Sequence, residues 1–435
     1  MTGEERVRVV VTGMGCVSPV GNDRLTTWDA LRHGRSGVAR IAGFDPSDLP
    51  SQTAGEVKGF DPVALLGHKE ARRTSRPVQF AVAAAREAVA DSGIDLGPIS
   101  ERAAVIVASG VGGLALFEKA VLAYAEGGYR KVSAFAAAGM LVDMPAGMVA
   151  ADVGARGPNF AIVSACASSA HAIGEAAEQI RRGDAVVALA GGTEGSITPV
   201  GMAMYCVIGA LSRRNDDPEA GSRPFDRDRD GFVTGEGAAI LVLEELGHAR
   251  ARGARIYGEL VGYGATADAA HITQPDPSGA QAARCISLAL ERAGRSPHDV
   301  GYVNAHGTGT PLNDPAETRA LKLALGEAVA TVPVSSTKSM TGHLTGAAGA
   351  LEAVITLMAI HDGFLPPTIN LDHPDPECDL NHVALVGRQA SPSLAISTSF
   401  GFGGHNACLA FAKVADADDA PPAHLLKNGW VRRAG

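Results

Sequence analysis

The chain has few aromatic side chains and no long uninterrupted hydrophobic run. Aromatic residues make up only 5% of its 435 residues. The most apolar stretches, such as 103–117, contain glycines and are shorter than the roughly 20 residues that a membrane-spanning helix needs. The N-terminus begins with acidic residues and shows no signal-peptide pattern. We therefore expect a cytoplasmic protein that does not associate with membranes.

Paired cysteines and basic blocks are also missing. The six cysteines are dispersed, without a CxxC pair and without the Cys/His spacing of a zinc site, so neither a disulfide scaffold nor a bound metal is expected. The 38 Lys and Arg are outnumbered by 47 Asp and Glu, which gives a net charge of −9. Because no basic stretch contains interleaved aromatics, nucleic acid is not an expected partner.

What is abundant is glycine and small apolar residues: 53 residues are glycine and 46% are hydrophobic. They are arranged in a series of elements that recurs in the same order in both halves of the chain. The matching pairs are VRVVVTGMG and IYGELVGYG, helices that stop at Gly93 and Gly294, AAVIVASG and VGYVNAHG, FAIVSACASSAHAIGEAAEQI and VPVSSTKSMTGHLTGAAGALEAVITLMAI, AVVALAGGTEG and LAISTSFGFGGHN, and AAILVLEEL and ACLAFAKV.

This alternation of strands and helices predicts an α/β fold whose parallel sheets are covered by helices, built as two pseudo-duplicated halves. We place the halves at 1–254 and 255–414, separated by a polar connector near 250–256, with a polar tail at 415–435. Insertions are expected at 112–158 and 200–230. The segment 213–232 is rich in charged and turn residues, so it predicts a loop rather than core.

Cys166 lies in a turn of small residues, SACASSAH, between a predicted strand and a predicted helix. The unpaired N–H groups and the dipole at a helix N-terminus favour an anion, which lowers the pKa of a thiol and increases the thiolate. This position therefore predicts a nucleophile. Cysteine also commonly behaves as a small buried hydrophobe, so a core residue is the alternative.

Three further reactive side chains follow predicted strands: His306 in NAHGTGT, and Lys338 and His343 in KSMTGH. In open parallel sheets functional groups gather at the carboxyl ends of strands, so we expect these side chains and Cys166 to meet in one pocket. Taken singly, each histidine could be structural, and Lys338 could be a solvated surface lysine.

Two glycine-rich stretches, GTGTPLND and GFGGHN, fit neither the GxxxxGK[ST] nor the GxGxxG phosphate pattern, so nucleotide binding is not expected. Gly403 and Gly404 would instead let backbone N–H groups face the pocket, where an oxyanion needs donors.

Several motifs are specific in combination: SACASS, RPFDRDRDGFVTGEGA, VNAHGTGTPLND, SSTKSMTGHLTGAAGALE, PPTINLD and SFGFGGHN. Through them nearly the whole chain resembles the β-ketoacyl-[acyl carrier protein] synthases of the long-chain bacterial type, in the thiolase-like superfamily. The resemblance implies a layered helix-sheet-helix-sheet-helix core. It also implies an acyltransferase of fatty acid elongation that condenses an acyl thioester with malonyl-ACP, by decarboxylative Claisen condensation through acyl-Cys166. No cofactor is expected, because phosphopantetheine arrives on the acyl carrier protein.

The resemblance implies roles for individual residues. Cys166 would carry the acyl group, and its N–H with that of Phe402 would form the oxyanion hole. Phe402 would also gate the acyl pocket. His306 and His343 would hold the malonyl thioester carbonyl and promote decarboxylation, and Lys338 would order the site electrostatically.

Four more residues would support the site. Glu352 would partner Lys338, and Thr308 and Thr310 would bond the phosphopantetheine amides. Phe232 would be an apolar wall that desolvates the malonyl carboxylate. A structural ion pair for Glu352 and a core aromatic for Phe232 are the alternatives.

The chain also departs from the family pattern. Met140, Asp143 and Pro145 are unexpected in the stretch that lines the acyl pocket, and Gly209 stands where relatives often have a basic residue for carrier contact. These departures leave the acyl chain length and the carrier open.

An acidic enzyme needs a local basic patch to bind an acidic carrier protein. The candidates are Lys69, Arg72 and Arg73, at i, i+3 and i+4 on one face if the segment is helical, joined by Arg130 and Lys131. A solvated charged surface without a partner is the alternative.

Three other functions compete with this reading. The first is a ketosynthase of a type II polyketide or polyene pathway, which would form a heterodimer with a chain-length factor instead of a homodimer. The second is the non-catalytic chain-length subunit itself, against which the intact Cys166, His306 and His343 count. The third is a degradative thiolase, which needs a second reactive cysteine where this chain has Phe400 and Phe402.

Overall fold

The computed structural model describes residues 7–414, so the predicted tail at 415–435 lies outside the described residues. Eleven strands form one sheet in the order β12-β10-β9-β14-β15-β8-β1-β7-β6-β4-β5. Their bounds are β1 Val9–Val17, β4 Ala103–Ala108, β5 Asn159–Phe160, β6 Val187–Glu194, β7 Gly237–Glu245, β8 Gly258–Ala267, β9 Tyr302–Asn304, β10 Pro333–Ser335, β12 Asn381–His382, β14 Leu394–Gly401 and β15 His405–Ala412. Two small ribbons pair β2 (Ala39–Arg40) with β3 (Thr53–Ala54) and β11 (Phe364–Leu365) with β13 (Arg388–Gln389).

The predicted duplication is confirmed by the strand order. The first half reads β5-β4-β6-β7-β1, and the second half repeats this as β10-β9-β14-β15-β8, with β12 added at the edge. The halves meet where β1 pairs with β8, through Val10↔Glu259 and Val11↔Gly258. The two glycines predicted to end corresponding helices, Gly93 and Gly294, do so with left-handed φ values of 61° and 62°.

The prediction that the sheets are parallel is wrong for one strand of each half. β7 runs antiparallel to β1 and β6, and β15 runs antiparallel to β8 and β14. The link from β14 to β15 contains only residues 402–404, which is enough for an antiparallel return and too short for a crossover to a parallel neighbour.

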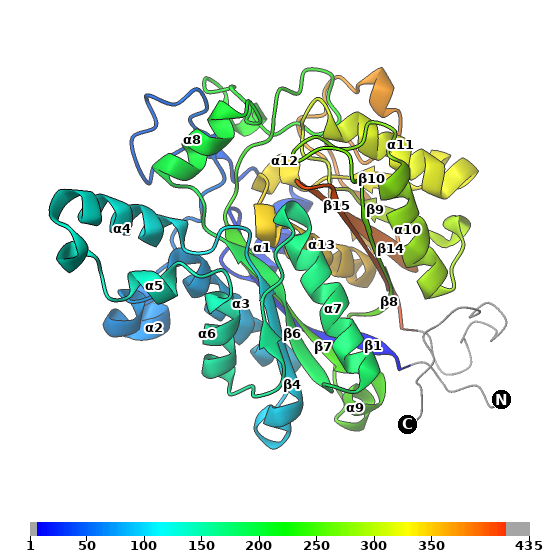
Figure 1. Cartoon of the computed structure of the whole chain (residues 1–435). Coiled ribbons are helices and arrows are strands. Elements are labelled where there is room, and N and C mark those ends of the chain that lie inside the picture. Colours follow the sequence, from blue (N-terminus) through cyan, green and yellow to red (C-terminus); the bar gives the residue numbers. More distant parts are fainter. Residues whose placement is uncertain (1–6, 415–435) are drawn as a thin grey trace.

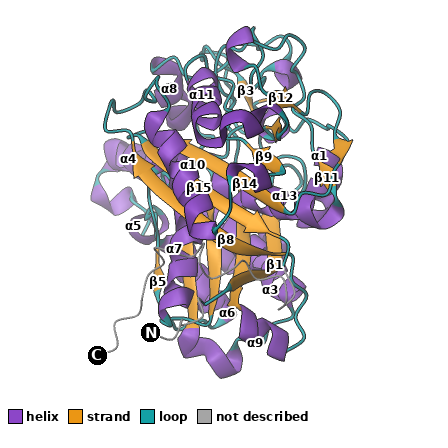
Figure 2. Ribbon diagram, turned by 90° about the vertical axis from the view of Figure 1, so that its right-hand side faces the viewer, coloured by secondary structure: helices purple, strands orange, loops and turns teal. Residues whose placement is uncertain are grey.

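The helices form three layers around the two halves of the sheet (Figures 1 and 2). Their bounds are α1 Arg24–Arg32, α2 Pro62–Ala71, α3 Arg76–Ser92, α4 Leu114–Gly127, α5 Ala136–Gly139, α6 Met144–Val153, α7 Ser168–Arg182, α8 Pro199–Val207, α9 Leu246–Ala251, α10 Ala280–Ala293, α11 Asn313–Leu325, α12 Lys338–Thr341 and α13 Ala348–Asp362. α3 and α6 pack on the first half, α10 packs on the second half and on α11, and α7 and α13 contact each other between the halves. Because α13 is enclosed, residues 348–360 are all buried.

The charged segment 213–232 is irregular, as predicted, but its middle belongs to the core. Phe225 has no exposed surface, and its backbone N–H donates to Asp314 Oδ2 at 2.7 Å. Arg223 Nε donates to the equally buried Asp226 at 3.0 Å. Hydrogen bonds and an internal ion pair thus satisfy polar groups that the sequence pattern assigned to solvent. Among the described residues, no helix combines the length and apolar character needed to cross a membrane.

Candidate active site

Cys166 lies in the 3-10 turn Ala165–Ala167, directly before the N-terminus of α7. The turn is strained, because Ala165 has a φ of 50° in the left-handed region that L residues rarely adopt. The loop after β14 is packed against it: a Cβ on Gly401 would lie 3.1 Å from the Cys166 nitrogen. The backbone N–H of Phe402, next in that loop, hydrogen-bonds the Cys166 sulfur. The loop therefore brings the two expected oxyanion donors to one place.

The predicted lowering of the Cys166 pKa is wrong for this site. Burial raises the pKa of the Cys166 thiol to about 11, and the Lys338 cation and the Phe402 N–H only partly offset this effect. The negative charges of Glu194 and Glu352 raise it further. This desolvation outweighs the effect of the helix N-terminus, and a sequence does not reveal it. The unacylated enzyme therefore holds a neutral thiol at pH 7.

This pKa predicts how Cys166 reacts with iodoacetamide. Because the thiolate is the nucleophile and its fraction grows until the pH reaches the pKa, labelling of Cys166 should accelerate about tenfold per pH unit from pH 7 to 9. Mass spectrometry of the Cys166 peptide measures the rate. A plateau below pH 8 would contradict the raised pKa. The half-buried Cys206 is expected to react as well. Cys166 should therefore be labelled faster only than the buried cysteines Cys16, Cys285, Cys378 and Cys408.

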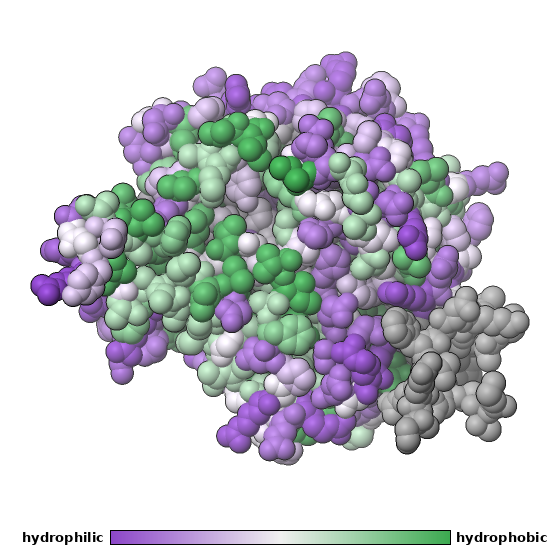
Figure 3. Space-filling model, in the orientation of Figure 1, coloured by the Kyte–Doolittle hydropathy of each residue, from purple (hydrophilic) through white to green (hydrophobic). Residues whose placement is uncertain are grey.

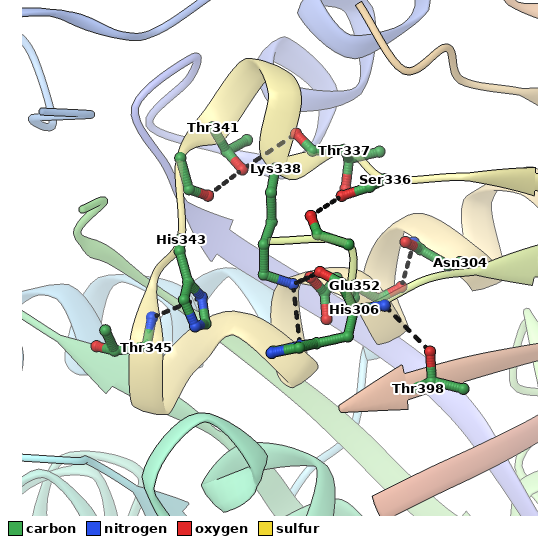
Figure 4. Close-up of polar contacts among 12 residues, drawn as sticks. Asn304, His306, Ser336, Thr337, Lys338, Thr341, His343, Thr345, Glu352 and Thr398 are labelled. Atoms are coloured by element: carbon green, nitrogen blue, oxygen red, sulfur yellow. Dashed lines mark hydrogen bonds and ion pairs between the residues drawn. The ribbon is translucent and has the colours of Figure 1, made fainter. Parts of the chain in front are cut away.

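His306 and His343 come from the second half of the chain (Figure 4), and both lie close to Cys166. The Cys166 Sγ and one ring nitrogen of each histidine all lie within 4.8 Å of one another. The two rings are 5.2 Å apart at an interplanar angle of 85°. The Thr345 N–H donates to His343 Nδ1 at 3.3 Å, so the proton of a neutral ring is on Nε2. His343 Nε2 is buried and has no hydrogen-bond partner among the described residues.

Both histidines are neutral at pH 7. Burial lowers their pKa values well below the ordinary 6.5, and the nearby Lys338 cation lowers them further. Each ring can therefore donate one N–H to a substrate oxygen, but neither is a ready proton source. This matches stabilisation of a developing oxyanion better than general acid catalysis.

Lys338 and Glu352 form a fully buried ion pair beside His306 (Figure 4). Lys338 Nζ also donates to the His306 carbonyl at 2.6 Å and lies 3.4 Å from His306 Nδ1. Lys338 is therefore not a solvated lysine, and it orients the His306 ring so that Nε2 carries the proton. Burial raises the pKa of Glu352 to about 7, against the opposing effect of Lys338.

The other expected site residues lie around this centre. The Phe232 ring stands edge-on to His343 at 5.4 Å, as expected for an apolar wall. Thr308 and Thr310 lie in the loop after β9, with their hydroxyl oxygens 2.9 Å apart. Their roles toward substrate stay predictions.

The structure brings to the site further residues to which the motifs assigned no role. Phe400 stands 5.8 Å from the His306 ring. Glu317 of α11 and Thr398 of β14 accept the His306 N–H at 2.8 and 3.0 Å and so fix its backbone. No sequence signal separates Glu317 from a surface glutamate, because its burial depends on how α11 packs.

The expected basic patch is divided between two segments. Lys69 lies in the last turn of α2, but Arg72 is its C-cap and Arg73 follows it, so they do not share one helix face. Gly67 also interrupts α2, with a non-helical φ of 76° and ψ of 160°, so only residues 68–71 are helical between this interruption and the end of the helix. Arg130 and Lys131 are exposed in the 3-10 turn Tyr129–Lys131. Arg73 stacks on the Phe135 ring at 4.9 Å, which brings α2 next to the segment that follows this turn.

Two clusters among the described residues could hold a metal ion. One is Cys166, His306 and His343, a set of soft ligands that suits Zn²⁺, whose binding would block the sulfur. The other is Asp226, Asp228 and His373, of which the last two are exposed. Neither cluster requires a metal, and the expectation of a metal-free enzyme stays a prediction.

Models of known protein families match most of the chain, and curated relatives match nearly all of it. The family model for the N-terminal domain of β-ketoacyl synthases matches residues 6–249, and the model for the C-terminal domain matches residues 257–372. The 3-oxoacyl-[acyl-carrier-protein] synthases 2 of Synechocystis and of Coxiella burnetii are each 48% identical to it, over 95% of this chain and 100% of the relative.

Solved structures of ketosynthases are also similar to this chain. A β-ketoacyl synthase from Burkholderia phymatum has a TM-score of 0.88 at 38% identity. A type II polyketide ketosynthase, bound to a hexaketide and in complex with its acyl-carrier protein, has a TM-score of 0.88 at 35% identity. The ishigamide ketosynthase/chain length factor has a TM-score of 0.87 at 36% identity. Each comparison covers 94% of this chain and 100% of the other.

Proposed function

Because this chain belongs to the β-ketoacyl synthase family and is an acyltransferase of the 3-oxoacyl-[acyl-carrier-protein] synthase type, we propose that Cys166, His306 and His343 carry its two half-reactions. The observation that carries the proposal is the convergence of one sulfur and two ring nitrogens within 4.8 Å, in a buried setting that keeps both rings neutral.

In the first half-reaction the Cys166 sulfur attacks the carbonyl carbon of an acyl thioester. A new C–S bond forms, the carrier sulfur leaves, and the thiol proton passes to that leaving thiolate. The N–H groups of Cys166 and Phe402 stabilise the tetrahedral oxyanion. Because the thiol is neutral at rest, proton loss accompanies attack instead of preceding it.

In the second half-reaction the malonyl thioester occupies the space beside the histidines. Its carbonyl oxygen accepts the Nε2–H of His306 and of His343, and the bond to the carboxylate breaks with release of carbon dioxide. The resulting enolate carbon attacks the acyl-Cys166 carbonyl, the C–S bond breaks, and Cys166 leaves as a thiolate that takes up a proton. Phe232 keeps water from the carboxylate, and Thr308 and Thr310 bond the phosphopantetheine amides that arrive on the carrier.

This division of roles predicts a separation of the half-reactions. His306→Ala or His343→Ala should lower malonyl decarboxylation roughly 10²-fold or more, since each removes a donor to the enolate oxygen, while acylation of Cys166 stays measurable. Intact-protein mass spectrometry follows acylation, and release of labelled carbon dioxide follows decarboxylation. His298→Ala, at an exposed histidine, is the matched control. Variants that lose acylation but retain decarboxylation would refute the assignment.

We take fatty acid elongation as the pathway, which is supported by the 48% identity to two 3-oxoacyl-[acyl-carrier-protein] synthases 2. A ketosynthase of a type II polyketide or polyene pathway is the second candidate, because one similar structure is a type II polyketide ketosynthase and another is a ketosynthase/chain length factor. Product analysis with malonyl-ACP and a panel of acyl primers separates the two pathways. Extension of primers with reduced acyl chains would favour fatty acid elongation. Products that keep their β-keto groups through repeated condensations would favour a polyketide pathway.

We propose an acyl carrier protein as the partner, which is supported by a similar ketosynthase in complex with one. The carrier would dock on Lys69, Arg72, Arg73, Arg130 and Lys131. Exposure of Lys69, Arg72, Arg130 and Lys131 supports this, as does the Arg73–Phe135 contact that draws the two segments together. Gly209 lies exposed at the end of α8, where it offers no charge.

We also propose that the chain forms a dimer through the outer edge of β5 and the insertion around α4 and α5. β5 pairs on one side only, with β4, and such an edge is available to another chain. Hydrophobic side chains gather on this face (Figure 3). The exposed ones are Phe117, Val121 and Leu122 of α4, and Phe135, Met140, Leu141, Phe160 and Val163. A purified chain that stays monomeric but pairs with a Cys-lacking homologue would favour the heterodimer.

A cytoplasmic location also remains our proposal.

A further inference from the structure

Glu194, the last residue of β6, is a buried carboxylate for which the described residues provide no ion-pair partner. One of its oxygens, Oε2, accepts the N–H of Gly110 at 2.9 Å, the N–H of Gly346 at 3.1 Å and the hydroxyl of Thr345 at 2.9 Å. The other, Oε1, accepts the Ser109 hydroxyl at 3.3 Å. Because burying a carboxylate without a cation is unfavourable, its position calls for a function.

Its place follows from the internal duplication. In the first half, Ile106 of β4 pairs with Ala190 of β6. In the second half, Val303 of β9 pairs with Ile396 of β14. Three residues after Ile106 and Val303 come the duplicates Ser109 and His306, and four residues after Ala190 and Ile396 come the duplicates Glu194 and Phe400. The middle residues of the 3-10 turns before α13 and α7 form the third pair, Gly346 and Cys166.

Glu194 thus occupies the duplicate of the active site. Gly346 stands where the active half has Cys166 and contributes no side chain. A Cβ on Gly346 would lie only 2.4 Å from the Gly110 nitrogen and 2.7 Å from Glu194 Oε2. The carboxylate fills the space that a second nucleophile would need, and it accepts the Gly346 N–H, the counterpart of the Cys166 N–H in the oxyanion hole.

From this position Glu194 reaches His343 through a single residue. Its Oε2 atom accepts two hydrogen bonds from this turn, one from the Thr345 hydroxyl and one from the N–H of the next residue, Gly346. Thr345 has a φ of 43°, a strained conformation that persists only where its surroundings hold it. Its own N–H is the donor to His343 Nδ1, at 3.3 Å.

We propose that Glu194 is a positioning residue for His343: by clamping the strained Thr345–Gly346 turn, it aims the Thr345 N–H at Nδ1 and so keeps the His343 proton on Nε2, which has no hydrogen-bond partner among the described residues. The duplicate site has thus lost its nucleophile and serves the active one. The catalytic consequence rests on the role proposed above for His343, whereas the position of its proton does not.

The test measures that proton directly. In protein labelled with ¹⁵N-histidine, with the His343 signals assigned by comparison with His343→Gln, the shifts of Nδ1 and Nε2 report the tautomer. The wild type should show protonated Nε2 only. Glu194→Ala should give a mixture of tautomers and lower malonyl decarboxylation roughly tenfold or more, with Cys166 acylation within about threefold of wild type. Glu194→Gln, which keeps an acceptor oxygen, should recover most of the loss.

Ser109→Ala is the matched control, because of the two side-chain hydroxyls that donate to Glu194 it removes the one that lies outside the Thr345–Gly346 turn, and it should leave the tautomer unchanged. If Glu194→Ala does not fold, Thr345→Ala and Thr345→Ser decide, since only the first deletes the hydroxyl link and should mix the tautomers. An unchanged tautomer in Glu194→Ala, or equal damage by Ser109→Ala or by Thr345→Ser, overturns the proposal. A changed tautomer without loss of decarboxylation supports the positioning by Glu194 and refutes instead the role of His343.

Discussion

Replacing Cys166 with alanine is expected to abolish the acyl-enzyme and to lower condensation by roughly 10⁴-fold or more, the size of loss seen when a covalent nucleophile is removed. No other cysteine can substitute for it, because Cys166 is the cysteine held near both histidines and the Phe402 N–H. Intact-protein mass spectrometry after incubation with acyl-carrier protein should show no added acyl mass.

Cys206→Ala is the control for this result. Cys206 is also half-buried, so its removal tests whether any accessible thiol can take the acyl group. It should leave the acyl-enzyme and the condensation rate close to wild type. Malonyl decarboxylation should continue in Cys166→Ala, because the donors for that step are on His306 and His343. Acylation of the Cys166→Ala protein would remove the basis of the mechanism.

Replacing Lys338 with methionine is expected to destabilise the protein by about 3–5 kcal/mol, because it leaves the Glu352 carboxylate buried without its cation. Urea unfolding measures the loss. Lys322→Met is the matched control: that lysine pairs with Asp379 at the surface, where an ion pair contributes about 1 kcal/mol or less. Adding Glu352→Leu to Lys338→Met should restore much of the stability, since no unpaired charge then remains.

The same variant should change the pH dependence. The Lys338 cation lowers the pKa of His306 and of His343, so its removal should raise both, although burial still keeps them low. Protonation of either ring would then begin at a higher pH, and decarboxylation should fall earlier as the pH is lowered than in the wild type. A loss of stability below 1 kcal/mol, or an acid limb at unchanged pH, would contradict the role given to Lys338.

The stability of the wild type should also decline in acid because of these histidines. Their pKa values are lowered in the folded protein, so below pH 6.5 the unfolded chain binds protons that the folded chain does not. The effect has the opposite sign for Glu352, whose raised pKa favours the folded state at low pH. Only the net slope is visible in a titration of the wild type, which is why the variants at Lys338 are needed.

We could predict from the amino-acid sequence the duplicated order of elements, the helix stops at Gly93 and Gly294, and the residues of the centre. These features depend on local pattern: period, turn residues and short motifs, which are written in consecutive letters. The gathering of Cys166 with His306 and His343 also followed from pattern, since residues after strands of one sheet share an edge.

The strand directions, the buried residues and the effect of burial on pKa values depend on contacts between distant segments, so they became visible only in the folded chain. β15 turns back antiparallel because only residues 402–404 link it to β14, and the charged segment around Phe225 enters the core through contacts with distant α11. The direction of the Cys166 pKa shift reversed for the same reason: the helix N-terminus is visible in the sequence, but the desolvation that outweighs it comes from the packing of two halves. Glu194 looks like any acidic residue in its own segment. Its function depends on a turn more than 150 residues later in the chain, which folding alone brings within hydrogen-bond distance.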